Sequence, residues 1–598
     1  MEDQQIIDLF FARSEEGILR LQEQYKAYCG KIAGQLLSQK EDVEEVLNDT
    51  WLSIWNAIPP EKPLFLKAYC AKIVRNFAIN RLKMLHAKKR AGNDFTESIE
   101  ELGEDIQLSV NNVEEHINED VLVSAINAFL SEQKKENRVF FVRRYFYHDE
   151  IKEMIVAARR AQQTYCQTFD QADVDEACKI TAKLVFDNAE RLAKIAVEET
   201  GMGVYEDKVA KNRNKSKGVW YDLKDKKSIG ILSIDNKTNL IEIAKPIGVV
   251  AGITPMTNPI VTPMSKIMFA LKTQNAIIIA PHPKAKYCSS LAVDMINEVL
   301  KPLGVPEGMV QVVREPSITK TQALMAMCDV TVATGGMPMV KSAYSSGKPS
   351  FGVGAGNVQV ILDRFIDYDL AAGKIITGRS FDNGIICSGE QSFIYPRSDK
   401  KEVFEAFERK GAYFVKGDER EKIINAIFED GMLARDIVGQ SVKFIADKAG
   451  IDLPENTRVI VVEANGIGRE DIVCKEKMCP VMACFPYDYF EEAINIAKTN
   501  LFLEGNGHTA GIHSNNQANI IKAGIDLSVS RLIVNAPCAT TAGGSIQNGL
   551  PVTNTLGCGS WGNNSISENF TYKHLLNITR VAPLSTRIHV PSDAEIWY

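Results

Sequence analysis

Residues 247–253, with the sequence IGVVAGI, decide the fold, because this short run is apolar and contains several β-branched residues. Runs of the same kind follow at 275–280 (NAIIIA), 309–313 (MVQVV) and 329–334 (DVTVAT), with helical patterns such as TPMSKIMFALKTQ between them. Strands that are buried on both faces of a parallel sheet have this composition. The alternation predicts a doubly wound α/β fold, the usual platform for a dinucleotide, although no G-x-G-x-x-G segment follows the first strand.

The bulk composition is that of a globular protein with several domains. The chain has 598 residues, 45% of them hydrophobic and 24% charged, and its formal net charge is -7. This acidic balance argues against a dedicated nucleic-acid-binding coat. Twelve cysteines without a C-x-x-C pair predict neither a disulfide framework nor a metal site. The acidic start MEDQQIIDLF and the lack of an apolar run of roughly 18 residues predict a cytoplasmic protein without a membrane span.

The reactive chemistry concentrates at residues 381–392, FDNGIICSGEQS. Cys387 stands there between two isoleucines and the small residues Ser388 and Gly389, so that its sulfur could face an open channel. An inert core thiol is the alternative, and on composition alone it is the commoner one. The sequence around Cys387 and elsewhere in the chain favours a reactive thiol over an inert one. Seven further segments of the chain have to be considered together with this one: ITPMTNP, APHPKA, ATGG, VKSAYSSGKPSFGVGAGN, CKEKMCPV, EGNGHTAG and TLGCGSWGNNSISEN.

Together these segments, from about residue 155 to the C-terminus, resemble the CoA-acylating aldehyde dehydrogenases. The resemblance implies the aldehyde dehydrogenase fold, with a Rossmann-like cofactor-binding domain at 155–360 and an α/β catalytic domain at 361–570. It assigns 571–598 to a C-terminal tail or oligomerisation segment and implies a homo-oligomer. It also implies that Cys387 attacks an aldehyde and that hydride transfer to a nicotinamide then leaves a thioester.

Two features bear on the fate of that thioester. Asn258 in TPMTNP is the candidate donor to the oxyanion, and an Asn hydrogen-bonded within a Pro-bounded turn is the alternative. Hydrolytic relatives carry a Glu-Leu-Gly-Gly segment whose glutamate activates water, whereas residues 352–357 here are GVGAGN, without a carboxylate. Without that base, the thioester should await the thiol of coenzyme A.

The resemblance also implies a site for NAD or NADP. Thr334 and the two glycines after it should open a helix beside the pyrophosphate, or form only a tight turn. Glu476 matches the glutamate that holds the nicotinamide ribose, with a solvated charge as the alternative. His282 stands where hydrolytic relatives often have a lysine near the adenosine ribose, which leaves NAD and NADP both open. The full candidate set is Thr254, Pro255, His282, Thr334, Gly335, Gly336 and Glu476.

Within the family, segments such as APHPKAK, GHTAGIHS and VPSDAEIW are most similar to CoA-dependent succinate-semialdehyde dehydrogenases. A terminal carboxylate on the substrate needs a cation or amides, because an unpaired buried charge is costly. Arg379, eight residues before Cys387, is the candidate cation, and a structural arginine at the surface is the favoured alternative. Acetaldehyde, propionaldehyde and sulfoacetaldehyde stay open as substrates.

The N-terminal part resembles a truncated sigma factor of the extracytoplasmic-function type. Residues 1–90 predict an all-α domain similar to sigma region 2, residues 91–128 an acidic linker, and residues 129–154 helices similar to the start of region 4. No recognition helix follows RYFYHDEIKEM. The resemblance implies that RNA polymerase core binds through the helix around Trp51 and Trp55. It implies DNA contacts, with a solvated basic helix end as the alternative, for Arg75, Asn76, Asn80 and Arg81.

Three functions are therefore weighed. The first is an acylating dehydrogenase that uses a nicotinamide cofactor and coenzyme A and no metal. The second is a transcription initiation protein that carries a passenger dehydrogenase. The third is a hydrolytic aldehyde dehydrogenase, which the absent glutamate disfavours.

Overall fold

The computed structural model divides the chain into two units, Met1–Val142 and Arg143–Tyr598, which we call the helical unit and the enzyme unit. It describes residues 3–14, 16–37, 40–59, 63, 66–89, 149–584 and 588–598. The predicted linker at 91–128 and most of the predicted region at 129–154 lie outside the described residues.

The helical unit is all-α in its described part, as predicted. It contains α1 (Asp3–Phe11), α2 (Glu16–Leu36), α3 (Lys40–Ala57) and α4 (Leu66–Lys89). Apolar residues at three- and four-residue spacing bury one face of each helix in a common core around Phe10, Ile54 and Val74, all fully buried.

A five-stranded parallel sheet forms one lobe of the enzyme unit, in the order β5-β4-β3-β6-β7. The four apolar runs identified in the sequence become its strands β3 (Val249–Thr254), β4 (Ala276–Pro281), β5 (Val310–Val312) and β6 (Val330–Thr334), next to β7 (Ser350–Val353). The helices between them are α11 (Val261–Lys272), α12 (Lys286–Leu300), α13 (Ile318–Met327) and α14 (Met337–Tyr344). Strands β3 and β4 are buried along their whole length, which is why their sequences lack polar alternation.

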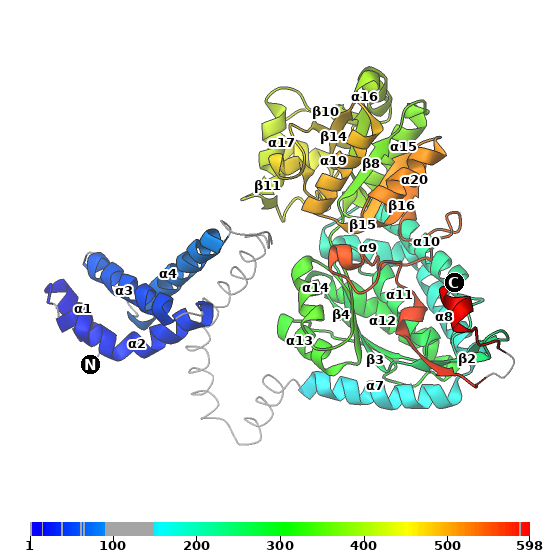
Figure 1. Ribbon diagram of the computed structural model, residues 1–598, viewed down its shortest axis with the longest axis horizontal. Coiled ribbons are helices and arrows are strands. Elements are labelled where there is room, and N and C mark those ends of the chain that lie inside the picture. The colour runs from blue at the N-terminus through cyan, green and yellow to red at the C-terminus, as the bar shows by residue number, and fades with distance from the viewer. Residues whose placement is uncertain are drawn as a thin grey trace. The chain divides into compact units, whose positions relative to one another are not determined.

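A second parallel sheet forms the other lobe (Figure 1), with seven strands in the order β10-β13-β14-β9-β8-β15-β16. The strands are β8 (Val358–Leu362), β9 (Glu390–Pro396), β10 (Ala412–Phe414), β13 (Val459–Glu463), β14 (Val481–Tyr487), β15 (Gly507–His513) and β16 (Val529–Val534). Its helices are α15 (Tyr368–Ser380), α16 (Lys400–Arg409), α17 (Glu419–Ile427), α18 (Val442–Ala449), α19 (Phe490–Leu503) and α20 (Gln517–Asp526). A short hairpin, β11 (Phe428–Glu429) with β12 (Met432–Leu433), lies between α17 and α18 in the sequence.

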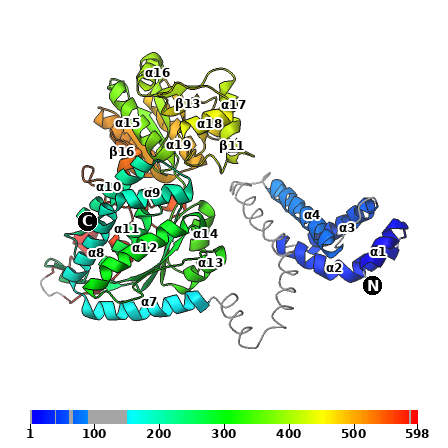
Figure 2. The ribbon, with the colours of Figure 1, turned by 180° about the vertical axis from the view of Figure 1, so that it is seen from behind.

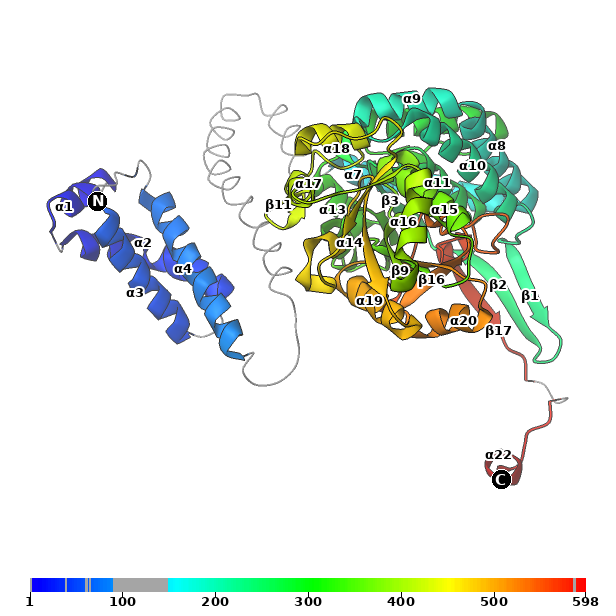
Figure 3. The same ribbon diagram turned by 90° about the horizontal axis from the view of Figure 1, so that it is seen from above.

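Helices precede the first sheet in the sequence, and a strand near the chain's end pairs with a strand that follows them. Helices α7 (Asp149–Thr168), α8 (Gln171–Asp187), α9 (Ala189–Thr200) and α10 (Tyr205–Leu223) come first. An antiparallel sheet follows, in which β17 (Leu576–Val581) pairs with β2 (Leu240–Pro246), and β2 pairs with β1 (Gly230–Asp235), as Figure 3 shows. Part of the segment predicted as a C-terminal tail is therefore a strand, followed later by the short helix α22 (Asp593–Trp597).

Helix α7 crosses the boundary that the sequence predicted between 154 and 155. It is continuous from Asp149 and runs beneath the five-stranded sheet in Figure 2. Ile151 is fully buried in the same core as β3 and β4, and Arg159 forms a bidentate ion pair with Asp329, at 2.8 and 2.9 Å. Residues 149–154 thus pack with the enzyme unit rather than with the sigma-like helices.

Candidate active site

Cys387 sits in the loop between the short 3-10 helix Phe381–Gly384 and strand β9. Three successive residues before it, Asp382, Asn383 and Gly384, have φ values of 52°, 53° and 71°. This left-handed turn is uncommon for residues other than glycine and gives the nucleophile loop a fixed course. A Cβ on Gly356 would lie 1.8 Å from the carbonyl oxygen of Cys387, so the GVGAGN loop packs directly on the cysteine's backbone.

Two cavities meet at Cys387. One of about 370 Å³ extends along the carboxyl ends of β3, β4 and β6, and the other, of about 90 Å³, lies between α10, the nucleophile loop and residues 539–556. Cys387, Asn258 and Asn554 line both of them. The larger cavity, called here the cofactor cavity, is where an open α/β sheet binds a dinucleotide. The smaller one is called the aldehyde cavity below.

All the residues that the sequence suggested for the cofactor line the cofactor cavity: Thr254, Pro255, His282, Thr334, Gly335, Gly336 and Glu476. Thr254 is buried, and its hydroxyl has no hydrogen-bond partner among the described residues. Gly336 caps the N-terminal end of α14, and added Cβ atoms on Gly335 and Gly336 would meet only ordinary contacts. An unsatisfied donor and an uncrowded helix start fit a nicotinamide dinucleotide, which would supply hydride transfer when bound.

Glu476 is a half-buried acid in the lining of this cavity, not a fully solvated charge. Its Oε1 accepts a hydrogen bond from the backbone N–H of Gly356 at 3.2 Å. The backbone N–H of Glu476 donates to the carboxylate of Glu504 at 2.7 Å. Burial, helped by the charge of Glu504, raises the pKa of Glu476 to about 8. The acid is therefore mostly protonated at neutral pH.

Burial also raises the pKa of the Cys387 thiol, to about 12, and the nearby Glu476 adds to this effect. Arg531 opposes it with a positive charge, although its guanidinium is held by the carbonyl oxygens of His508 and Gly557, both at 2.7 Å. The thiol is consequently neutral in the ligand-free protein at pH 7.

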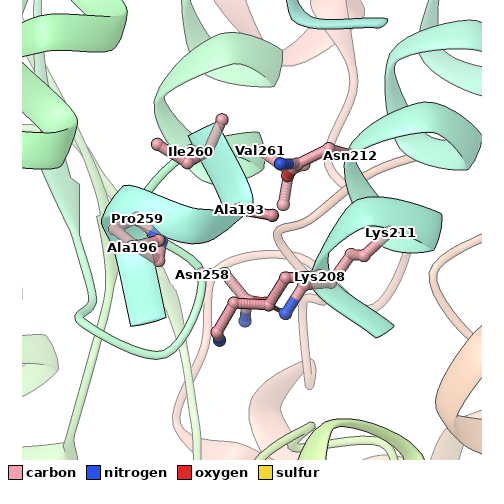
Figure 4. A pocket seen from close by; sticks show the side chains of 9 residues that line it. All are labelled: Ala193, Ala196, Lys208, Lys211, Asn212, Asn258, Pro259, Ile260 and Val261. Atoms are coloured by element: carbon pink, nitrogen blue, oxygen red, sulfur yellow. Dashed lines mark hydrogen bonds between the residues drawn. The ribbon is translucent and has the colours of Figure 1, made fainter. Parts of the chain in front are cut away.

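A charged cluster that the sequence reasoning missed fixes the orientation of Asn258. Lys211 Nζ donates to Asn258 Oδ1 at 2.7 Å and to Asp382 Oδ2 at 2.5 Å, and Lys208 donates to the same Asp382 oxygen at 3.1 Å. Figure 4 shows both lysines, from α10, beside Asn258. The two positive charges hold the pKa of Asp382 below its ordinary value against the effect of burial. Because the amide oxygen accepts from Lys211, the amide nitrogen of Asn258 is the donor end; it donates to Thr257 Oγ1 at 3.4 Å and has a second N–H for another acceptor.

Comparisons with known proteins identify the family of the enzyme unit. Residues 135–429 match the family model described as "Aldehyde dehydrogenase family". The chain is 53% identical over 448 residues to the succinate-semialdehyde dehydrogenase (acetylating) of Clostridium kluyveri. The aligned region covers 75% of this chain and 98% of that protein. The chain belongs to the aldehyde dehydrogenase family.

Solved structures place it among the acylating members. The acetylating aldehyde dehydrogenase of Geobacillus thermoglucosidasius is 37% identical, with a TM-score of 0.71 over 74% of this chain and 98% of that one. The propionaldehyde dehydrogenase of Rhodopseudomonas palustris, solved with bound CoA and an acylated cysteine, is 28% identical with a TM-score of 0.66, over 72% and 97%. The predicted fold and enzyme class are confirmed.

The N-terminal resemblance is confirmed as well. Residues 21–87 match the family model described as "Sigma-70 region 2". On α4 of this aldehyde dehydrogenase, Arg75 is half-buried and Asn76 is exposed, while the side chain of Asn80 lies outside the described part. Arg81 pairs with Asp42 at 2.8 Å and Glu45 at 2.7 Å, so it ties α4 to α3.

Arg379, the candidate cation for the substrate's carboxylate, lies away from both cavities. It is fully buried and lines neither cavity of the dehydrogenase. Its guanidinium donates to the carbonyl oxygens of Lys477 and Cys479, and so holds the segment that carries Glu476. The arginine is structural, as the alternative had it, but in the core and not at the surface.

The aldehyde cavity contains two lysines that the sequence reasoning did not single out, Lys211 and Lys215, both on α10. With Lys208 they recur at positions i, i+3 and i+7, which is one face of a helix. That spacing was a readable signal, because three lysines on the face that meets the core need partners. Neither a cluster of three or more metal-binding side chains nor a helix able to cross a membrane occurs in the described part of the chain.

Proposed function

We propose that the enzyme unit interconverts succinate semialdehyde, coenzyme A and NAD(P)+ with succinyl-CoA and NAD(P)H. The observation that carries this proposal is the position of Cys387, which lines a cofactor cavity and a separate small cavity at the same time. A nucleophile at such a junction can hold an acyl group where a hydride acceptor and an acyl acceptor both reach it.

The side chains at the junction suit the individual steps. The Cys387 thiol loses its proton to solvent, and its sulfur then adds to the aldehyde carbon. The amide nitrogen of Asn258 and the backbone N–H of the nucleophile donate to the oxyanion that forms. After the hydride has left this carbon, a thioester remains on Cys387. The thiolate of coenzyme A then attacks the thioester carbonyl, and the Cys387 thiolate is the leaving group.

Coenzyme A is favoured over water because, among the described residues, no carboxylate that is mostly ionised at neutral pH lines either cavity. The loop at 352–357 carries no carboxylate. Glu476 is the acid in the cofactor cavity, and it is mostly protonated below pH 8 and accepts from Gly356 N–H. A protonated carboxyl group cannot accept the proton of an attacking water.

Succinate semialdehyde is proposed as the aldehyde because the relative from C. kluyveri bears that name and because the aldehyde cavity is small and lined by cations. The test is reduction of NAD(P)+ by the purified protein with succinate semialdehyde, with and without coenzyme A, beside Cys387→Ser. We expect turnover that needs coenzyme A and is lost in the variant. Turnover without coenzyme A would indicate hydrolysis, and activity only with acetaldehyde or propionaldehyde would reassign the substrate.

A second function is supported for the helical unit. The match to sigma-70 region 2 leads us to propose that α3 and α4 bind RNA polymerase core and DNA. Trp51 is buried in the core of the unit and Trp55 packs against Arg13, whereas Leu52 on α3 is 60% exposed. Co-purification of the full chain with RNA polymerase core, weakened in Leu52→Arg, would support this function. No association with core at low salt would contradict it.

A further inference from the structure

Lys215 is the cation of the aldehyde cavity that lacks a counter-charge. Lys208 and Lys211, on the same face of α10, share Asp382 as their partner. Lys215 Nζ instead donates to two backbone carbonyl oxygens, of Gly543 at 3.0 Å and Thr553 at 3.3 Å. No described carboxylate lies within 4.0 Å of it. The cavity lining contains no aspartate or glutamate.

Such a charge is costly for the folded protein. Burial lowers the pKa of Lys215 to about 8, and repulsion from Lys211 works in the same direction. An ammonium has three donors and needs an anion or three acceptors to compensate for its lost hydration. Two donors are used within the protein, and the third is available to a molecule in the cavity.

The nucleophile shares this cavity with Lys215. Both groups line the aldehyde cavity, and the negative charge of the Cys387 thiolate, when it forms, raises the pKa of Lys215. The lining between them is mixed, with apolar Phe381, Ile386 and Leu556 beside polar Thr540. An aldehyde bound to Cys387 thus has apolar walls along its carbon chain and a cation for a charged end.

We propose that Lys215 binds the terminal carboxylate of the aldehyde and selects ω-carboxy aldehydes over uncharged aldehydes of similar length. This inference rests on the proposed function insofar as it takes the cavity to be the aldehyde's site. A carboxylate supplies the missing acceptor and a charge-assisted hydrogen bond. An uncharged aldehyde gives the ammonium of Lys215 no anionic partner. Discrimination between carboxylate-bearing and uncharged aldehydes therefore arises at this one residue. A sulfonate would carry the same charge at the end of a shorter chain.

The first test compares kcat/KM for succinate semialdehyde, sulfoacetaldehyde and butanal in the full-length protein. Lys215→Gln keeps donors for the two carbonyl oxygens and removes the charge. Lys217→Gln, an exposed lysine on the same helix, is the matched control. We expect the ratio of succinate semialdehyde to butanal to fall roughly 10- to 100-fold in Lys215→Gln, the loss of a hydrogen bond to a charged group. The control should keep the wild-type ratio.

A second test needs neither cofactor nor coenzyme A. An aldehyde adds reversibly to the Cys387 thiol, whose S–H adds across the C=O bond, and so protects the cysteine from iodoacetamide. Protection by succinate semialdehyde should need a lower concentration than protection by butanal in the wild type, and the difference should vanish in Lys215→Gln. Modification is read by peptide mass spectrometry at Cys387.

These measurements separate the two proposals. An absence of CoA-dependent turnover together with Lys215-dependent protection would overturn the proposed function and support the anion site. Turnover with an unchanged substrate ratio and unchanged protection in Lys215→Gln would overturn the role of Lys215. A ratio that favours sulfoacetaldehyde, and is lost in the same variant, would overturn the choice of carboxylate.

Discussion

Lys211 Nζ lies 2.7 Å from Asn258 Oδ1, and this contact turns the amide nitrogen of Asn258 away from α10. The same lysine is anchored by Asp382, whose left-handed backbone belongs to the turn that precedes Cys387. The amide donor and the nucleophile are therefore oriented by one cluster. This arrangement makes Lys211 a positioning residue, which acts through Asn258.

Replacement of Lys211 should lower kcat through the loss of Asn258 orientation. A single oxyanion donor is worth about 10²–10³ in kcat, and we expect Asn258→Ala to lose that much and Lys211→Met to lose a large part of it. In the double variant the two losses should not add, because both remove the same interaction. Lys208→Met is the control. Lys208 contacts Asp382, and its replacement leaves the hydrogen bond from Lys211 to Asn258 in place. Full additivity would contradict this role.

Replacement of Gly356 should displace the nucleophile. A Cβ at this position would lie 1.8 Å from the carbonyl oxygen of Cys387, so Gly356→Ala must move the GVGAGN loop or the cysteine. A displacement of about 1 Å costs on the order of 10²-fold in rate. Gly373→Ala is the matched control, because its Cβ would meet Lys410 at an ordinary 3.7 Å. Equal kcat values in the two variants would show that the loop accommodates the methyl group.

The thiol of Cys387 should be slow to alkylate in the ligand-free protein at neutral pH. Its pKa is raised to about 12, so the thiolate fraction should increase tenfold per pH unit between pH 7 and 10. The rate of iodoacetamide modification at the Cys387 peptide measures this dependence, with Cys387→Ser as the blank. A plateau already reached near pH 8 would mean that the thiol is activated without ligands.

Glu476 should make the stability of the ligand-free protein depend on pH. Its folded-state pKa of about 8 is above the ordinary value of 4.5. The contribution of Glu476 to the free energy of unfolding is therefore fully present below pH 4.5 and is lost as the pH rises to 8. Glu476→Gln stays neutral and keeps an acceptor for Gly356. The Tm of this variant should match that of the wild type near pH 5 and exceed it at pH 8. At pH 8 the free energy of unfolding of the variant should be higher by up to ~4 kcal/mol. An equal Tm difference at both pH values would contradict the shift.

The sequence predicted the parts of this protein that depend on local pattern. Apolar runs such as NAIIIA became buried strands because they are short and rich in β-branched residues, which favours a strand over a buried helix. The cofactor candidates came from the family resemblance, and the structure places all of them in the lining of one cavity.

Contacts between distant segments were not accessible in this way. Arg379 was a candidate for the substrate's carboxylate beside a structural alternative, and its partners are carbonyl oxygens about 100 residues away, at Lys477 and Cys479. Lys211 and Lys215 lie far before the nucleophile in the sequence and meet its loop only in the folded protein. Helix α7 was divided at residue 154 because its first turns also fit a sigma-like pattern, and only their packing against the sheet decides the matter.

The most direct test of the central claim is a single-turnover experiment with succinate semialdehyde and NAD(P)+ in the absence of coenzyme A. The account predicts a burst of NAD(P)H close to one equivalent per active site, an acyl group on Cys387 in the intact-protein mass, and no further turnover until coenzyme A is added. Continuous formation of NAD(P)H without coenzyme A, or a full burst in Cys387→Ser, would contradict it.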